Sequence, residues 1–403
     1  MRHVVAALAA LTLAATVASC ADGRGGNGAV DDSSAAAPIR IGLVISDTGS
    51  QAPLAGEARK AVGLAADQLN AKGGVLGRKV EVLYGDDRTL PDEAVLAFED
   101  LAAKDVVAVI GPVFPDAARA VEPIAQREGV PYLSLAPAGE RAQPIRSYVF
   151  DTPAPAWMYA ERYLRYLRSE RLTKVAVAYD RASAYAVAGH TAVDELGARY
   201  GVQVVADEAY EATTTDFDPI LTRAGDSGAD ALLFWGTGEP GVTVTRQYAA
   251  SGLRIPLLLT GSQAGRLWLD PVGTAVEGVI VQSTIGVVGD QLPAGPQKAI
   301  IDQLAVPYEQ QHGHAPSQVA QDGYSAALLL FEAIKRAGGT DRERIRTALE
   351  STTLLTPNGR YRFSPADHFG LSPDYISVNT VSDGRFVPTG WAKEQLAKTV
   401  TGR

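Results

Sequence analysis

Short apolar runs alternate along this chain with longer segments in which apolar residues recur every three or four positions. The first such runs are residues 39–45, 79–84, 106–110 and 130–135, and the later ones are residues 174–179, 202–206, 230–235, 255–260 and 278–283. Runs of this kind are typical of strands buried on both faces, and the segments between them of amphipathic helices. The alternation therefore predicts mostly parallel sheets with helices on both faces.

A Pro-rich stretch, FDTPAPA (150–156), divides the alternation into two similar series. A length of 403 residues also favours two domains over one. Three helical segments follow the second series, and a hairpin pattern with Asp383-Gly384 at its turn comes last. The predicted fold class is α/β, with two doubly wound parallel-sheet lobes.

Composition and motifs exclude several kinds of function. A net charge of −9 argues against nucleic acid or an anionic membrane surface as partner. The turn after the first strand, SDTGSQAPLAG, lacks the spacing of a dinucleotide or phosphate loop, and no G-x-S-x-G elbow occurs. The five histidines are scattered in sequence, without metal-ligand spacing. We therefore expect no enzyme activity, no cofactor and no metal site.

The N-terminus has the pattern of a secretory signal. Met1-Arg2 is followed by the apolar run VVAALAALTLAATVA, which is too short to span a bilayer comfortably. The run ends in Val17-Ala18-Ser19-Cys20, which resembles the bacterial lipobox. That resemblance implies a lipoprotein signal peptide at residues 1–19 and a lipid on Cys20, the only cysteine. Residues 20–37, rich in Gly, Ala, Ser and Asp, are predicted to be a flexible tether to the membrane. An ordinary secretory signal with a chance cysteine is the alternative.

The order of motifs in the body resembles one family, the branched-chain amino-acid and amide solute-binding proteins of ABC transporters. The motifs that carry the likeness are Thr48-Gly49, Ala71-Lys72-Gly73-Gly74, Gly77-Arg78, Asp86-Asp87, Gly111-Pro112 and Gly129-Val130-Pro131. The likeness extends from Ile39 to about Val387. It implies the type I periplasmic-binding fold, in which a small ligand is enclosed between two lobes by a hinge motion. It also implies a monomer whose partner is an ABC permease.

The resemblance further implies how the chain divides into lobes. Three crossovers are expected near Asp151, Ser283-Thr284 and Leu355. Lobe 1 would then comprise residues 38–150 and 285–354, and lobe 2 residues 151–284 and 355–403. Each lobe is therefore predicted to be discontinuous in sequence.

Only some of the positions that hold an amino acid in this family carry the family's usual residue type here. The position where the family has its first ligand-binding hydroxyl is occupied here by Phe114 or Pro115. The position of the second hydroxyl lies in the turn SLAPAGE, at Ala138 with Ala136 nearby. The acid for the ammonium falls near Gln263. The remaining candidates are the aromatic residue Tyr185, Thr237 in the second lobe, and Thr48 and Ser50 after the first strand.

These departures disfavour a zwitterion. Pro115 lacks an N–H donor. Asp116, at the helix start, would cap the helix and repel a carboxylate by about 3 kcal/mol at about 5 Å. Gln263 carries no charge to neutralise an ammonium. We therefore hypothesise a neutral, cationic or aromatic ligand, held by the aromatic residues Phe114, Tyr185 and Trp235 and by hydrogen bonds from Thr48, Ser50, Thr237 and Gln263.

Simpler interpretations stand beside this one. Phe114 fits core packing, Asp116 fits a helix cap alone, and Trp157 and Trp235 fit structural positions. The leading function is a lipid-anchored, extracytoplasmic receptor of an ABC importer. Binding of a branched-chain or other amino acid, and ligand sensing by a protein of the same fold, are the alternatives.

Overall fold

The computed structural model describes residues 37–137, 145–276 and 278–401. Residues 37–403 group into one compact unit. The predicted signal peptide, Cys20 and most of the tether therefore lie outside the described residues, as does Ala138.

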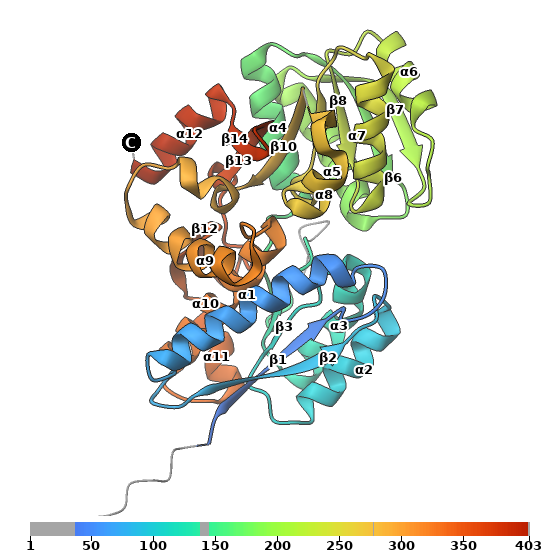
Figure 1. The fold of residues 1–403 in the computed structure, drawn as a ribbon. Coiled ribbons are helices and arrows are strands. Elements are labelled where there is room, and N and C mark those ends of the chain that lie inside the picture. Colours follow the sequence, from blue (N-terminus) through green and yellow to red (C-terminus); the bar gives the residue numbers. More distant parts are fainter. Residues whose placement is uncertain (1–36, 138–144, 277, 402–403) are drawn as a thin grey trace, which may run out of the picture. The chain divides into compact units, whose positions relative to one another are not determined.

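The first sheet has five parallel strands in the order β2-β1-β3-β4-β5 (Figure 1). The strands are β1 (Ile39–Ile45), β2 (Val80–Asp86), β3 (Val109–Ile110), β4 (Tyr132–Ser134) and β5 (Val149–Asp151). The helices between them are α1 (Ala52–Ala71), α2 (Pro91–Ala102) and α3 (Pro115–Glu128). Neighbouring residues of β1 enter different cores: Leu43 packs on the side of α1, and Val44 on the side of α2 and α3. Burial on both faces explains why this strand is apolar apart from the exposed Arg40 near its start.

The second sheet has seven strands in the order β14-β13-β10-β9-β8-β6-β7. Five are parallel: β6 (Lys174–Asp180), β7 (Gln203–Tyr210), β8 (Ala231–Trp235), β9 (Leu257–Leu259) and β10 (Val279–Thr284). The helices of this part are α4 (Ala156–Glu170), α5 (Ala184–Tyr200), α6 (Asp218–Asp226), α7 (Glu239–Ser251) and α8 (Arg266–Val272). In β8, Leu233 and Trp235 face the core that contains α4 and α5, and Leu232 and Phe234 face the one that contains α6 and α7.

The predicted C-terminal hairpin is present and extends this second sheet. Strands β13 (Ile376–Ser382) and β14 (Arg385–Pro388) pair antiparallel across Asp383-Gly384, and β13 also pairs antiparallel with β10. The sheet is therefore parallel in its centre with an antiparallel edge, a common arrangement in large sheets. Helix α12 (Gly390–Thr401) follows.

Three further helices lie between β10 and the hairpin in sequence: α9 (Pro296–His312), α10 (Gln318–Ala337) and α11 (Arg342–Leu349). Helix α10 packs along α1, on the first sheet (Figure 1). The Asp341 carboxylate accepts the N–H of Arg344 at 2.9 Å, so its predicted N-cap role is confirmed. A small separate hairpin, β11 (Thr353–Thr356) and β12 (Gly359–Arg362), follows α11.

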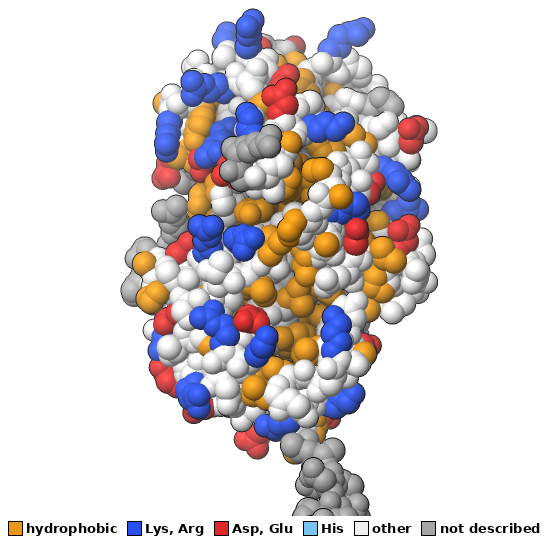
Figure 2. Space-filling view, turned by 90° about the vertical axis from the view of Figure 1, so that its left-hand side faces the viewer, with side chains coloured by type: hydrophobic (Ala, Val, Ile, Leu, Met, Phe, Trp, Pro, Cys, Tyr) orange, Lys and Arg blue, Asp and Glu red, His pale blue; other side chains and the backbone are white. Residues whose placement is uncertain are grey.

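The chain thus leaves one sheet for the other after Asp151, after Thr284 and again between β12 and β13. The third passage is longer than the sequence suggested, because the hairpin around Leu355 belongs to neither large sheet. The exact division into lobes stays a prediction. Below, "first lobe" means the five-stranded sheet with its packed helices, and "second lobe" the seven-stranded sheet with its own. Hydrophobic side chains gather in a band across the middle of one face, and charges of both signs are spread around it (Figure 2).

Gly189, in α5, offers a test of the second lobe's packing. A Cβ at this position would overlap the ring of Trp235, a fully buried side chain that contacts Tyr185 edge-to-face with ring centroids 5.8 Å apart. Because a core this tight resists added volume, we expect Gly189→Ala to lower the free energy of unfolding by about 1–3 kcal/mol. Gly56, in α1, has no atom within 4 Å of its would-be Cβ. Gly56→Ala should instead stabilise by up to about 1 kcal/mol through helix propensity. Urea denaturation measures both, and equal effects of the two substitutions would contradict the packing described.

Candidate functional site

A cavity of about 250 Å³ lies where the carboxyl ends of strands from both sheets meet. Small-molecule sites span about 300–1,000 Å³, so this one suits a small ligand. The starts of α1, α3 and α10 contribute to its lining on the side of the first sheet, and the start of α5 on the side of the second. Its described lining residues are Gln51, Leu54, Val113, Phe114, Pro115, Asp116, Leu135, Pro137, Pro153, Ala154, Tyr159, Asp180, Ala182, Ser183, Ala184, Tyr185, Ala212, Thr237, Gly261, Ser262, Gln318, Val319 and Asp322. We call it the cleft cavity.

Half of the predicted binding residues line the cleft cavity: Phe114, Pro115, Asp116, Tyr185 and Thr237. Tyr185 is held by its edge-to-face contact with Trp235, so Trp235 supports the cavity from behind without lining it. Burial raises the pKa of the Tyr185 hydroxyl, which keeps it a neutral donor at ordinary pH.

Asp116 does not cap α3, contrary to the prediction. The N-cap residue is Phe114, which makes no side-chain cap bond, and Pro115 occupies the first turn. The Asp116 carboxylate accepts a bond of 2.6 Å from the Arg119 guanidinium, one turn further along the helix. The acid therefore lies beside the cavity with part of its charge balanced, and its repulsion of an anion is weaker than the sequence argument assumed.

Three other predicted residues do not line the cleft cavity. The Thr48 hydroxyl donates to Asp86 at 2.7 Å, which fixes the turn after β1 against the end of β2, and Ser50 is exposed in the same turn. Gln263 is 1% exposed, and its amide bonds inward, to the Gly236 carbonyl and the Ser262 hydroxyl. Each of these polar groups serves a local turn, and the lining positions are taken by the neighbours Gln51 and Ser262.

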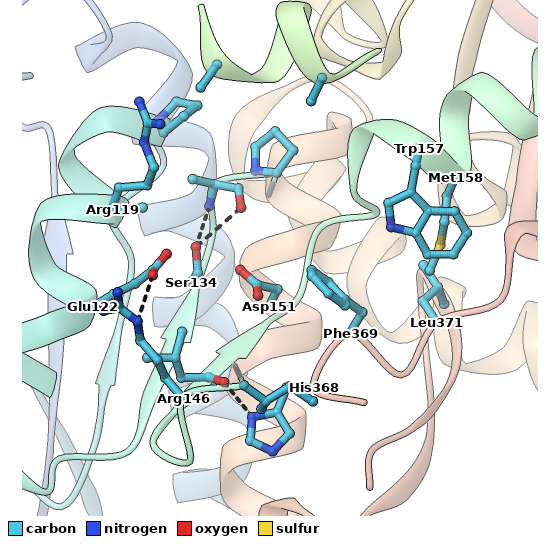
Figure 3. Close-up of a pocket in the computed structure, with 18 of the residues that line it drawn as sticks. Arg119, Glu122, Ser134, Arg146, Asp151, Trp157, Met158, His368, Phe369 and Leu371 are labelled. Atoms are coloured by element: carbon cyan, nitrogen blue, oxygen red, sulfur yellow. Dashed lines mark hydrogen bonds and ion pairs between the residues drawn. The ribbon is translucent and has the colours of Figure 1, made fainter. Parts of the chain in front are cut away.

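Ala136 lines a second, larger cavity of about 650 Å³, drawn in Figure 3. Pro115, Pro137, Ala182 and Ala184 line both cavities, so the two adjoin. We call the larger one the side cavity. Its other described lining residues include Arg119, Glu122, Ser134, Arg146, Asp151, Trp157, Arg181, Asp367 and Phe369.

Asp322 is the most unusual group of the cleft cavity. It lies one turn into α10 and is 4% exposed. Its Oδ1 accepts bonds from the Gln318 amide at 2.9 Å and the Asn358 amide at 2.7 Å. Burial outweighs these two donors and raises the pKa of the carboxyl to about 7. No lysine, arginine or histidine of the described chain pairs with it, and Oδ2 is left for a donor from a ligand.

Asp180 adds a second buried acid. It ends β6 and is 7% exposed, and its side chain accepts the N–H of Ala182 at 3.0 Å at the start of α5. Burial raises its pKa. Together with Asp116 and Asp322 it gives the cleft cavity three carboxylates, whereas its described lining contains no lysine, arginine or histidine. The electrostatic character of the cavity is therefore acidic.

Sequence reasoning missed Asp180, Gln318 and Asp322. Asp180 directly follows a predicted strand, a position where ligand groups are common. Asp322 lies on the same face of its helix as Val319 and Ala326, both buried. An ionisable residue beside these buried apolar positions was thus the available signal.

The histidines show no metal-ligand spacing among themselves in the sequence. The structure places His190 beside Asp194 and Asp207, with one ligand atom from each within 4.8 Å of the others. The His190 ring stacks on Tyr179 at 4.2 Å, and its Nε2 is 2.9 Å from the Asp207 carboxylate. These contacts account for the arrangement without an ion.

Two covered sheets with a cavity at the ends of strands from both define a class: the two-lobed solute-binding receptors of the type I periplasmic-binding fold. The family model described as periplasmic binding protein matches residues 38–385, so the chain belongs to that family. It is a solute-binding protein of the branched-chain amino-acid type. The predicted family and fold class are confirmed. No helix within the described residues is long and apolar enough to cross a membrane.

Relatives and solved structures agree with this assignment. The chain is 26% identical over 343 residues to a leucine-, isoleucine-, valine-, threonine- and alanine-binding protein of Pseudomonas aeruginosa, covering 82% of this chain and 87% of the relative. A Leu/Ile/Val-binding protein homologue of Brucella abortus is 24% identical, with coverages of 79% and 82%. The substrate-binding protein LivJ of Streptococcus pneumoniae, in complex with isoleucine, matches with a TM-score of 0.76 at 24% identity, covering 87% and 97%. A solute-binding protein of R. palustris in complex with benzoate gives a TM-score of 0.76 at 20% identity, covering 88% and 96%.

The raised pKa of Asp322 predicts how stability depends on pH. An unfolded aspartate titrates near about 3.9, whereas folded Asp322 titrates at about 7. Between these values the folded chain binds more protons, so this group makes stability fall as pH rises, by at most about 1.4 kcal/mol per pH unit. The unfolding free energy of Asp322→Asn minus that of the wild type should therefore increase between about pH 5 and pH 7, because only the wild type loses this contribution as pH rises. Urea denaturation across that range measures it. Asp226→Asn, at an exposed position, controls for the lost charge. A difference that does not vary with pH would contradict a raised pKa at Asp322.

Proposed function

We propose that this protein is the extracytoplasmic, lipid-anchored receptor of an ABC importer, and that it captures a small solute bearing a cationic amine by closing its two lobes on it. The observation that carries the choice of ligand is the acidic lining of the cleft cavity. Asp116, Asp180 and Asp322 line it, and no basic side chain occurs among its described residues. The Val17-Ala18-Ser19-Cys20 motif supports the lipid anchor, and the family supports transport.

A buried acid in need of a cation favours an ammonium. Bonds between an ammonium and a carboxylate are shorter and stronger than neutral hydrogen bonds. Asp322 has Oδ2 available and no cationic partner within the described chain. Phe114, Tyr159 and Tyr185 line the same cavity, and aromatic faces attract cations further.

The cleft cavity is less suited to a ligand that has a carboxylate and no ammonium. Pro115 removes one N–H from the start of α3. Ser183 accepts the N–H of Ala186 at the start of α5, and Ser317 that of Ala320 at the start of α10, so two of the helix-start donors are already used. An anion such as the benzoate of the R. palustris protein would also face three acids.

An amino acid is the second candidate, and one observation favours it. The first turn of α5 begins at Ala184 and Tyr185, which line the cavity, and the N–H groups of a first turn have no partner within their helix. They could receive a carboxylate while Asp322 or Asp180 receives the ammonium. The names of the Pseudomonas relative and of LivJ with isoleucine support this reading.

A set of three matched probes separates these ligands. Isopentylamine is leucine without its carboxylate, and isocaproate is leucine without its ammonium. We expect isopentylamine to raise the melting temperature of the chain from residue 21 onward, because its ammonium meets Asp322 and Asp180, and isocaproate to have no effect. Thermal shift, followed by calorimetry, measures this. If leucine binds at least about tenfold more tightly than isopentylamine, the amino-acid alternative is correct; binding of isocaproate alone would refute both readings.

The acids of the cleft cavity should differ in how much each contributes to the affinity for an amine. Asp322→Asn keeps both acceptor bonds to Oδ1 but removes the charge, so isopentylamine affinity should fall by about 10- to 100-fold. Asp116→Asn should cost less, because Arg119 already balances Asp116. Wild-type affinity should rise with pH through about 7 and level off above it, as Asp322 ionises, and this dependence should weaken in Asp322→Asn. Asp226→Asn serves as the charge control, and calorimetry at several pH values is the measurement. Equal losses from Asp116→Asn and Asp322→Asn would place the ammonium elsewhere.

A further inference from the structure

The side cavity has more than twice the volume of the cleft cavity, about 650 Å³ against about 250 Å³. The two adjoin along Pro115, Pro137, Ala182 and Ala184, which line both. These four residues offer no charged side chain at the junction. A flexible apolar chain held by one end in the cleft cavity could therefore extend past them into the side cavity.

The arginines that line the side cavity already have acidic partners. Arg119 bonds Asp116 at 2.6 Å, Arg146 lies 3.6 Å from Glu122, and Arg181 pairs with Glu211. Asp367, which also lines it, accepts the N–H groups of Phe369 and Gly370. An anionic ligand would have to compete for arginines that are engaged.

Asp151, unlike these charged side chains, lacks a balancing partner among the described residues. It ends β5, and its backbone N–H donates to the His368 carbonyl at 3.0 Å, which fixes the residue at the cavity. Its carboxyl group interacts with the Ser134 hydroxyl and feels the negative charge of Glu122, and no lysine, arginine or histidine of the described chain forms an ion pair with it. Burial and Glu122 raise its pKa to about 8. Figure 3 shows Asp151 among Ser134, Glu122 and Phe369.

The remaining lining also suits a cation. Trp157 and Phe369 present aromatic rings to the side cavity (Figure 3), and such rings attract ammonium groups. The side cavity thus shares one feature with the cleft cavity, a carboxyl group that has no cationic partner in the described chain and lies close to aromatic side chains, although arginines also line it.

We propose that the ligand is a linear diamine or longer polyamine, with one ammonium at Asp322 and Asp180 in the cleft cavity and a second at Asp151 in the side cavity. This inference rests on the proposed amine-binding function, and it adds a second subsite and a substrate class to it. The methylene chain between the two charges would lie against the apolar residues shared by the cavities. A single amine would fill only the smaller of the two.

The test compares diamines with monoamines of equal chain length. The probes are putrescine, cadaverine, hexamethylenediamine and octamethylenediamine, each beside butylamine, pentylamine, hexylamine or octylamine, with spermidine added. Calorimetry on the chain from residue 21 onward gives the affinities. At the chain length that reaches Asp151, the diamine should bind at least about tenfold more tightly than its monoamine, as one added charge-assisted bond predicts.

Substitutions then show which residue is responsible for the higher affinity of the diamine. Asp151→Asn should abolish the diamine advantage and leave monoamine affinity unchanged, whereas Asp322→Asn should weaken both. Asp226→Asn should change neither, and the melting temperature of each variant shows that it is folded. If monoamines bind but no diamine gains affinity, or if the gain survives Asp151→Asn, the second subsite is wrong while the proposed function stands. If no amine binds, the proposed function itself fails.

Discussion

A buried hydrogen-bond network around Asp322 connects the cleft cavity with all three passages between the sheets. Asp322 accepts from Gln318 and Asn358, and the Gln318 amide oxygen in turn accepts the backbone N–H of Thr284 at 2.6 Å. Thr284 ends β10, at the second passage, and Asn358 lies in the third. The Asn358 amide also donates to the Tyr361 hydroxyl at 3.3 Å, which donates to the Thr152 carbonyl in the first. One carboxylate in the cavity is thus joined to all three passages between the sheets.

Such a network requires that its polar groups be satisfied, because an unpaired polar group in a buried position is costly. Asn358 and Thr284 are fully buried, and each has its partners inside the network. Asp322 is the member whose charge has no partner there. On the proposed function, an ammonium supplies that partner, and the hydrogen-bond pattern around the hinge is completed by the ligand. Ligand charge and lobe closure would then be coupled through shared atoms, with no longer pathway needed.

Sequence reasoning succeeded where one residue pattern has one structural meaning. Strands such as β1 and β8, apolar on both faces, predicted covered parallel sheets, and Asp383-Gly384 predicted the hairpin that extends the second sheet. It failed where a polar side chain has two possible hydrogen-bond partners and its role depends on which of them it bonds. Asp116 bonds Arg119 in place of the helix start, and Gln263 bonds the Gly236 carbonyl in place of a ligand. Asp322 acquires its role from Asn358, 36 positions away, and no local pattern encodes that contact.

The site also shows how a fold with helix starts at its cleft can favour a cation. The starts of α3, α5 and α10 each direct the positive end of a helix dipole at the cavity, which by itself suits an anion. Each of these three starts carries an acid close by: Asp116 in α3, Asp180 before α5 and Asp322 in α10. A helix dipole end is equivalent to about half a charge, so an ionised carboxylate at a helix start can reverse its sign. Asp322 does so once the pH exceeds its pKa of about 7, and Asp116 contributes less because Arg119 bonds it. The fold supplies the place for a ligand, and on the proposed function the three acids at these helix starts determine the charge of the ligand that it suits.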